Sequence, residues 1–146
     1  MGFFERVLFG DTRAWVCSQA AGDVLEVAIG TGLNLPFYPE STRLTGIEWS
    51  PAMLGVARGR AAKLGQSADL RGGDAYDLPF PDVSFDTVVC TFSLCAIPDE
   101  RRAVAEMTRV LRPGGRLLLA RSHRGFDLTR ARGPAPSRAR HCAAGR

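Results

Sequence analysis

Two glutamates and a pair of glycines have the types and the spacing of a nucleoside-binding site. Glu26 lies in the apolar run Val24–Ile29, which leads directly into Gly30-Thr31-Gly32, and a second apolar run, Leu44–Glu48, ends in another carboxylate. Glycine adopts positive φ and lets backbone amides approach a ligand closely. A carboxylate at the end of the second strand is placed to bind the two hydroxyls of a ribose. The pattern indicates a nucleoside site, although Gly-x-Gly also occurs in ordinary tight turns.

The segments that must position these residues alternate between strand and helix patterns. A helix is predicted from Pro51 to Leu64, with Ser50 as its N-cap and Gly65 at its end, and another from Asp99 to a stop at Pro113-Gly114-Gly115. The predicted strands cover residues 24–29, 44–48, 69–71, 84–92 and 116–120. This alternation predicts an α/β fold, in which a doubly wound, mostly parallel sheet carries helices on both faces.

The ligand of such a sheet binds beyond the carboxyl ends of the strands, where two nucleotide cofactors have to be compared. The NAD fingerprint Gly-x-Gly-x-x-Gly/Ala needs a small third residue. Counting from Gly30 that residue is Leu35, and counting from Ala28 it is Leu33, so the pyrophosphate site is poorly formed. The loop that binds S-adenosylmethionine resembles (Glu/Asp)-x-Gly-x-Gly-x-Gly, which residues 26–32 match except at Ala28. The sequence therefore favours S-adenosylmethionine.

A longer stretch carries a family resemblance. "GGDAYDLPFPDVSFDTVVCTFSLCAIPDERRAVAEMTRVLRPGGRLLLA", residues 72–120, closely resembles the class I methyltransferases of the ubiquinone/menaquinone-biosynthesis and phospholipid-methylating type, which have the methyltransferase type 11 domain. The resemblance spans roughly residues 22–120 and includes several motifs in the correct order. It implies a Rossmann-like sheet with strand order 3-2-1-4-5, which in relatives is followed by an antiparallel hairpin.

The resemblance implies a cofactor site distributed over four loops. The methionine half is expected near the first loop, at Glu26, Ala28, Gly30, Thr31 and Gly32. Glu48 is expected to bind the ribose, with Trp49 beside the adenine, Asp74 accepting from its amino group and the Ala75 amide meeting a ring nitrogen. Thr91, Phe92 and Ser93 are expected to line the cleft under the sulfonium. The alternatives are that Asp74 is a turn residue and that Trp49 and Phe92 are packing residues.

The implied reaction is methyl transfer to a small-molecule or lipid-like acceptor by in-line displacement. Because the sulfonium is already activated, the protein mainly holds the reactants in line and excludes water, and no catalytic residue is predicted. No metal site is predicted either, because the cysteines (Cys17, Cys90, Cys95 and Cys142) lack the spacing of zinc ligands. Cys90 is expected to be a core thiol in a reducing compartment.

The bulk composition and charge fit one small domain with a basic tail. At 146 residues the chain can bury one core. No apolar stretch approaches the ~20 residues of a membrane-spanning helix, and no secretory signal is recognisable, so the expected location is cytoplasmic. Residues 124–146 hold six arginines and one acid, which leaves the remainder nearly neutral. The tail is predicted to be disordered, and it makes nucleic-acid binding a weak third hypothesis.

The organisation predicted from these patterns has three parts: a helical segment at 1–21, a cofactor-binding core at 22–123 and the basic tail at 124–146. After Ala120 the chain departs from the family, because nothing resembles the terminal hairpin. A truncated or frameshifted reading frame is one explanation. The fifth strand is then expected to be an exposed edge carrying Leu117, Leu118 and Leu119, open to self-association. The alternative to a working methyltransferase is accordingly a truncated cofactor-binding remnant with little turnover.

Overall fold

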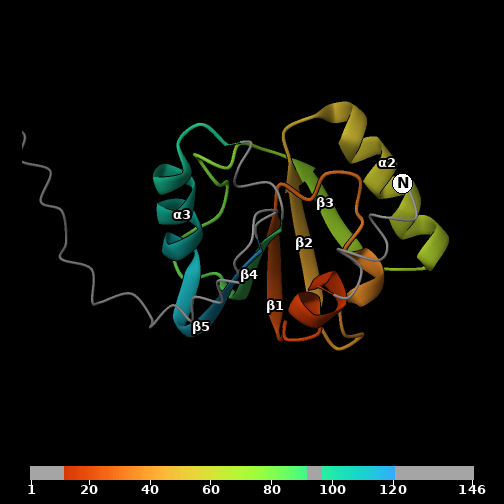
Figure 1. The fold of residues 1–146 in the computed structure, drawn as a ribbon, viewed down its shortest axis with the longest axis horizontal. Helices are drawn as coiled ribbons and strands as arrows, with labels where there is room; N and C mark the ends of the chain where they lie inside the picture. The colour runs from red at the N-terminus through yellow and green to blue at the C-terminus, as the bar shows by residue number, and fades with distance from the viewer. Residues whose placement is uncertain (1–11, 92–96, 121–146) are drawn as a thin grey trace, which may run out of the picture.

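A computed structural model describes residues 12–91 and 97–120, which form one parallel sheet covered on both faces (Figure 1). The strands are β1 (Asp23–Val27), β2 (Arg43–Glu48), β3 (Ala68–Gly72), β4 (Phe85–Thr91) and β5 (Leu111–Ala120). The helices are η1, a short 3-10 helix (Leu35–Phe37), α2 (Pro51–Leu64) and α3 (Glu100–Arg109). The strand order is β3-β2-β1-β4-β5, and every pairing is parallel, which confirms the predicted α/β class and order.

The order of the strands places one set of loops at a single edge of the sheet. From β1 the chain passes outward to β2 and β3, then returns to pair β4 with the other side of β1. In register, Val27 pairs with Ile47, and Glu48 pairs with Gly72. Because the strands are parallel, the loops that follow β1, β2 and β3 lie together at their carboxyl ends, where sheets of this kind bind ligands.

Each face of the sheet is covered by a separate apolar cluster. On one face, α2 (Leu54, Ala57) packs together with residues 12–17 (Val16, Cys17). On the other face, α3 contributes Ala103 and Met107, which pack with Val88 of β4. Figure 1 shows α2 and α3 on opposite sides of the strands. Cys90 is fully buried, as expected of a core thiol.

The ends of α2 follow from local sequence. Ser50 is the N-cap, and its hydroxyl accepts a hydrogen bond from the Met53 amide at 3.3 Å, while Pro51 takes the first helical position, which needs no donor. Gly65 ends the helix with φ 63° and donates its N–H to the Ala61 and Ala62 carbonyls. This confirms the predicted bounds, and it fixes the start of the helix next to the end of β2.

Three predicted boundaries are wrong. The first strand ends at Val27 rather than Ile29, because Ala28 turns the chain with φ 57°. The helix predicted over residues 3–21 ends at residue 17, and its residues before 12 lie outside the described part. The helix predicted to continue to the Pro113 stop ends at Arg109, and Pro113-Gly114-Gly115 lies inside β5 rather than before it.

The early end of α3 has a physical reason in β5. Val110 and Leu111 are fully buried, which gives them the same apolar signature in a helix or in a strand. The carbonyl of Val110 accepts the Ser84 and Phe85 amides at 2.8 and 2.9 Å, so this residue already belongs to the sheet. Arg112, the next residue of β5, pairs with Asp23 and Asp86 at 3.0 Å each.

The edge strand β5 differs from the expectation in its side chains. Among the described residues β5 pairs with β4 alone, so no described strand pairs with the backbone groups along its outer edge. Leu117 and Leu118 are only 4% and 3% exposed, and Leu119 packs against the cluster on the α3 face. The prediction that this edge exposes three leucines is therefore wrong. Residues 121–146, with the predicted basic tail, lie outside the described part.

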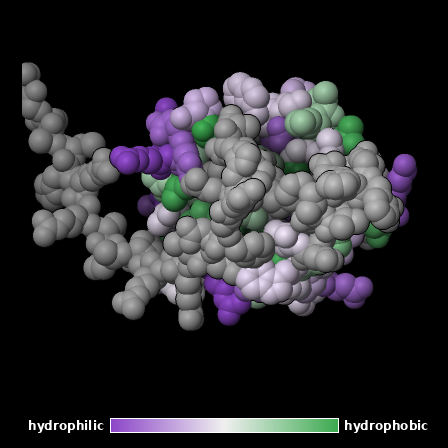
Figure 2. All heavy atoms as spheres, in the orientation of Figure 1, coloured by the Kyte–Doolittle hydropathy of each residue, from purple (hydrophilic) through white to green (hydrophobic). Residues whose placement is uncertain are grey.

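The surface is mainly polar with scattered apolar side chains. Figure 2 shows hydrophilic and hydrophobic residues interspersed over the part of this face that the described residues form. The large exposed apolar side chains are Trp15, Trp49, Met53, Val56, Leu64 and Val83. In the described residues, every helix is too short or too polar to span a bilayer.

Candidate cofactor-binding site

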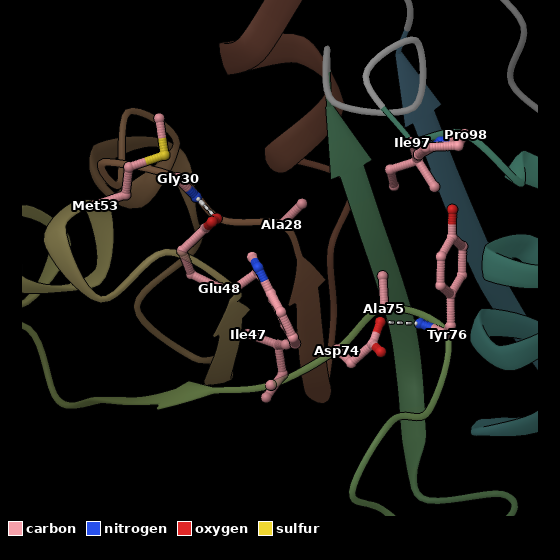
Figure 3. Close-up of a pocket in the computed structure, with 12 residues that line it drawn as sticks. Ala28, Gly30, Ile47, Glu48, Met53, Asp74, Ala75, Tyr76, Ile97 and Pro98 are labelled. Atoms are coloured by element: carbon pink, nitrogen blue, oxygen red, sulfur yellow. Dashed lines mark hydrogen bonds between the residues drawn. The ribbon is translucent and has the colours of Figure 1, made fainter.

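A cavity of about 530 Å³ lies at the carboxyl ends of β1, β2 and β3 (Figure 3). This volume is within the range typical of small-molecule sites. Most of its wall comes from the loops after these three strands, and the end of β2, Met53 on α2 and the short segment 97–98 complete it. Its lining residues are Ala28, Gly30, Ile47, Glu48, Trp49, Met53, Gly73, Asp74, Ala75, Tyr76, Ile97 and Pro98.

The loop after β1 has a backbone that only a few residue types accept easily. Ala28, Gly30 and Gly32 all have positive φ, at 57°, 62° and 81°. A Cβ placed on Gly30 would meet no atom within 4 Å, so the space above this glycine is open. A Cβ on Gly32 would lie 2.7 Å from Leu35 and 3.3 Å from Ala57, so this glycine permits close packing of the loop on α2. Gly30 thus borders the cavity, while Gly32 lets the loop pack closely against α2.

Glu48 ties the first two loops together. Its carboxylate accepts the Gly30 amide at 2.8 Å and the Ser50 amide at 3.1 Å, so it joins the loop after β1 to the start of α2 (Figure 3). The residue is 8% exposed and lines the cavity. A carboxylate has about four acceptor positions. Two of them remain for the hydroxyl groups of a ligand.

The loop after β3 brings a second carboxylate to the same cavity. The Gly73 amide donates to the Glu48 carbonyl at 3.2 Å, which continues the β2–β3 pairing into the loop. Asp74 then accepts the Tyr76 amide at 2.8 Å (Figure 3). This is a local turn contact, as the alternative proposed, but Asp74 and Ala75 also line the cavity. One oxygen of Asp74 orders the turn, and the carboxylate keeps acceptor positions for a ligand.

The wall beyond Asp74 is formed by residues that lie near the start of α3. The Tyr76 hydroxyl accepts the Asp99 amide at 2.7 Å, and the Arg102 guanidinium lies 5.1 Å from the centre of its ring. Ile97 and Pro98 precede these contacts in the chain and also line the cavity. Tyr76 therefore connects the loop after β3 to the N-terminus of α3.

Glu26 lies beneath the glycine loop and does not line the cavity. Its carboxylate accepts Asn34 Nδ2 at 2.6 Å and the Tyr38 hydroxyl at 2.8 Å. Burial raises the pKa of Glu26 from 4.5 to about 7, and its hydrogen bonds with Tyr38 and Asn34 and the charge of Arg13 oppose that rise. Burial also raises the pKa of the neighbouring Cys17 to about 12. The carboxylate thus belongs to a buried polar network.

The predicted site residues divide into three groups. Six of them line the cavity: Ala28, Gly30, Glu48, Trp49, Asp74 and Ala75. Four lie in the described part but outside the lining: Glu26, Thr31, Gly32 and Thr91. Phe92 and Ser93 lie outside the described residues. Trp49 is 76% exposed, so it is not the packing residue that the alternative required.

Six lining residues were not predicted from the sequence: Ile47, Met53, Gly73, Tyr76, Ile97 and Pro98. Gly73 and Tyr76 flank the predicted Asp74-Ala75 pair, and their proximity in the chain was a usable signal. Ile97 and Pro98 could not be found from spacing, because their position depends on how the chain returns from β4 to α3.

The chemistry of the lining fits S-adenosylmethionine. Two carboxylates, on Glu48 and Asp74, can accept from ribose hydroxyls and from an adenine amino group, while Ile47, Met53 and Ile97 provide apolar walls for the base. Next to the Glu48 carboxylate, the open space at Gly30 admits a ligand against the backbone. Among the described residues, no group of three or more His, Cys, Asp or Glu side chains could hold a metal ion.

Comparisons with known proteins agree with this geometry. A family model for the methyltransferase domain matches residues 25–119. A phosphatidylethanolamine N-methyltransferase of Cereibacter sphaeroides is 45% identical over 67% of this chain and 49% of its own length. A demethylmenaquinone methyltransferase of Deinococcus radiodurans is 42% identical over 79% of this chain and 52% of its own length. The chain thus spans about half the length of these curated relatives.

Solved structures show the same fold. The YcgJ protein of Bacillus subtilis superposes with a TM-score of 0.67 at 31% identity, covering 76% of this chain and 48% of that one. The [4+2]-cyclase SpnF gives the same TM-score at 32% identity, over 75% of this chain and 42% of its own. With the family match, the sheet order and the cavity in agreement, the chain belongs to the class I S-adenosylmethionine-dependent methyltransferase family.

Proposed function

We propose that this protein transfers a methyl group from S-adenosylmethionine to a small-molecule or lipid-like acceptor. The observation that carries the proposal is the meeting of Glu48, Asp74 and the Gly30 backbone in one cavity at the carboxyl ends of three adjacent strands. The acceptor class is supported by the two curated relatives, one named for phosphatidylethanolamine and the other for demethylmenaquinone.

Four lining residues have a proposed role in holding the nucleoside part of the cofactor. Glu48 binds the ribose hydroxyls with the acceptor positions that Gly30 and Ser50 leave available. Asp74 accepts from the adenine amino group, and the neighbouring Ala75 amide meets a ring nitrogen. Trp49 flanks the base at the cavity mouth, where it is largely exposed. Thr31 and Gly32 belong to the glycine loop, and Glu26 and Thr91 lie beneath or beside it; we propose that these four residues support the methionine half.

The chemistry asks little of the protein beyond placement. When bound, S-adenosylmethionine would supply an activated methyl group for in-line attack by an acceptor nucleophile, with the thioether of the demethylated cofactor as the leaving group. The chain's own residues hold the nucleoside, exclude water and align the acceptor, which together lower the barrier without a dedicated acid or base. We therefore propose no catalytic residue.

Calorimetric titration of the full chain with S-adenosylmethionine and with its demethylated product tests the proposal. We expect a dissociation constant in the micromolar range or weaker. NAD serves as the control nucleotide, because the glycine loop lacks the small third residue of its fingerprint. Folded protein that binds neither form of the cofactor would contradict the proposal.

A second candidate is a protein that binds the cofactor with little turnover. It is favoured by one observation: among the described residues, every lining residue comes from the end of β2, from the loops after β1, β2 and β3, from Met53 or from segment 97–98. No described residue is assigned to the acceptor. Transfer of a labelled methyl group to quinones, phospholipids and small amines separates the two candidates, because only the methyltransferase yields labelled product.

A further inference from the structure

A chain of hydrogen bonds, part-buried at Arg13 and buried at Asn34, connects residues 12–17 to the loop at residues 28–32. Arg13 Nη1 donates to Asn34 Oδ1 at 2.8 Å and lies 3.5 Å from Thr91 Oγ1. Asn34 Nδ2 donates in turn to Glu26 Oε1 at 2.6 Å and to Thr91 Oγ1 at 2.7 Å. These contacts join four parts of the fold: the segment 12–17, β1, the loop before η1 and the end of β4.

Burial makes each of these contacts costly to lose. Asn34 is 1% exposed and Glu26 is 2% exposed, so their polar atoms are out of reach of bulk water. Removing one partner of a buried hydrogen bond leaves the other without compensation for its desolvation. Arg13 therefore orients the Asn34 amide: with Oδ1 held by the guanidinium, Nδ2 points to Glu26 and Thr91.

The network holds the binding loop at both of its ends. Glu26 precedes the loop and Asn34 follows it, and the two side chains bond to each other across residues 28–32. The Leu35 amide donates to the Gly32 carbonyl at 3.2 Å, which fixes the same end from the backbone. Within this span, Ala28 and Gly30 line the cavity. A movement of Asn34 thus changes the position of the residues that face the ligand.

We propose that Arg13 is a positioning residue of the cofactor site, which acts through Asn34 and Glu26 to fix the loop at residues 28–32. The inference rests on the proposed function. Arg13 itself does not line the cavity. It makes cofactor affinity depend on the docking of residues 12–17 against the end of the sheet, and it gives this segment a role that packing alone does not require.

The test is a double-mutant cycle measured on cofactor affinity. The full chain, Arg13→Ala, Asn34→Ala and the double variant are each titrated calorimetrically with the demethylated product of the cofactor. We expect each single change to weaken binding about tenfold, because it removes a hydrogen bond that fixes the end of the loop. Because both residues act on one loop, the double variant should bind no more than about twofold more weakly than Asn34→Ala.

Two further variants separate positioning from general stability. Arg13→Lys retains the charge and one donor, and it should bind more tightly than Arg13→Ala but more weakly than the parent chain. Arg101→Ala, an exposed arginine on α3, should bind within about twofold of the parent. If Arg13→Ala does not fold, the comparison of Arg13→Lys with Arg101→Lys replaces it.

The outcomes distinguish this inference from the function on which it rests. If the parent chain binds the cofactor and the Arg13 variants bind equally well, the positioning role is wrong and the function stands. If the losses of the two single variants multiply in the double variant, the relay through Asn34 is wrong. If the folded parent chain binds neither form of the cofactor, the proposed function and this inference both fail.

Discussion

Glu26 and Glu48 occupy similar places on adjacent parallel strands but have different surroundings. Glu26 lies one residue before the end of β1, and its side chain enters the buried layer, where Asn34 and Tyr38 donate to it. Glu48 is the last residue of β2, lines the cavity, and receives two backbone amides. The same side chain is thus buried beneath the loop in one strand and lines the cavity in the next.

The last two residues of a strand at the edge of a cavity therefore differ in their surroundings. Glu26 is still within the pleat, so its side chain points into the layer formed by residues 12–17 and η1. Glu48 stands where the pairing gives way to loops, next to open space. The donors to Glu26 are side chains, on Asn34 and Tyr38. The donors to Glu48 are backbone amides of the loops beside the cavity. A substitution at Glu26 is therefore expected to act on folding, and one at Glu48 on binding.

The largest expected effect is the pH dependence of stability caused by Glu26. Its pKa rises from 4.5 to about 7 on folding, so the folded state binds the proton more tightly and the free energy of unfolding falls as pH rises through this interval. The loss is roughly 3 kcal/mol, since a tenfold change in proton binding corresponds to about 1.4 kcal/mol. Urea unfolding between pH 5 and 8 measures this loss. The free energy of unfolding of the parent chain should fall by about this amount relative to that of Glu26→Gln, because glutamine does not ionise. If the free energy of unfolding had the same pH dependence in both proteins, the raised pKa of Glu26 would be refuted.

Removing the second carboxylate should act on affinity instead. Glu48→Ala is expected to weaken cofactor binding about 30-fold, since it removes hydrogen bonds to a charged group worth roughly 2 kcal/mol. It also frees the Gly30 amide, which loosens the loop. The measurement is a calorimetric titration, and the matched control is Glu40→Ala, an exposed glutamate away from the cavity. Equal affinity in Glu48→Ala and Glu40→Ala would remove Glu48 from the site.

Asp74 sharpens the comparison, because it both orders a turn and lines the cavity. Asp74→Asn keeps an oxygen for the Tyr76 amide but loses the charge. We expect binding to weaken about fivefold to tenfold, with a melting temperature close to that of the parent chain. Asp77→Asn, an exposed residue of the same turn, is the control. A large fall in stability without a change in affinity would show that Asp74 is only a turn residue.

The smallest expected effect concerns Ala28, which lies in the loop that follows Glu26 and contacts Glu48 through Gly30. Its φ of 57° is unfavourable for a residue with a Cβ. Glycine removes this strain but adds freedom to the unfolded chain, so Ala28→Gly is expected to stabilise the fold by about 1 kcal/mol or less. Thermal unfolding measures it, and Ala62→Gly in the interior of α2 should show the opposite sign. A destabilised Ala28→Gly variant would contradict the strained loop.

Sequence reasoning found the loops that form the cavity but not how each residue within them is used. The glycine pair and Glu48 were predicted because turn chemistry and strand ends are local signals, whereas Asp74-Ala75 was predicted from the family resemblance. The burial of Glu26 was not predicted. An apolar run indicates that a strand is buried, but it does not show which other side chains pack against each position of the strand. The end of α3 was misplaced because buried Val110 and Leu111 fit both a helix and a strand. Ile97 and Pro98 depend on the tertiary path.

The pairing of β1 has a consequence for the order in which the molecule assembles. Val24 pairs with Leu44 on one side and with Thr87 on the other, so the first contact closes a much shorter loop. Short closures cost less entropy and form sooner. Most of the cavity wall lies between residues 28 and 76. That wall is expected to come together during folding before β4 pairs with β1, so the surface around the cavity would form early.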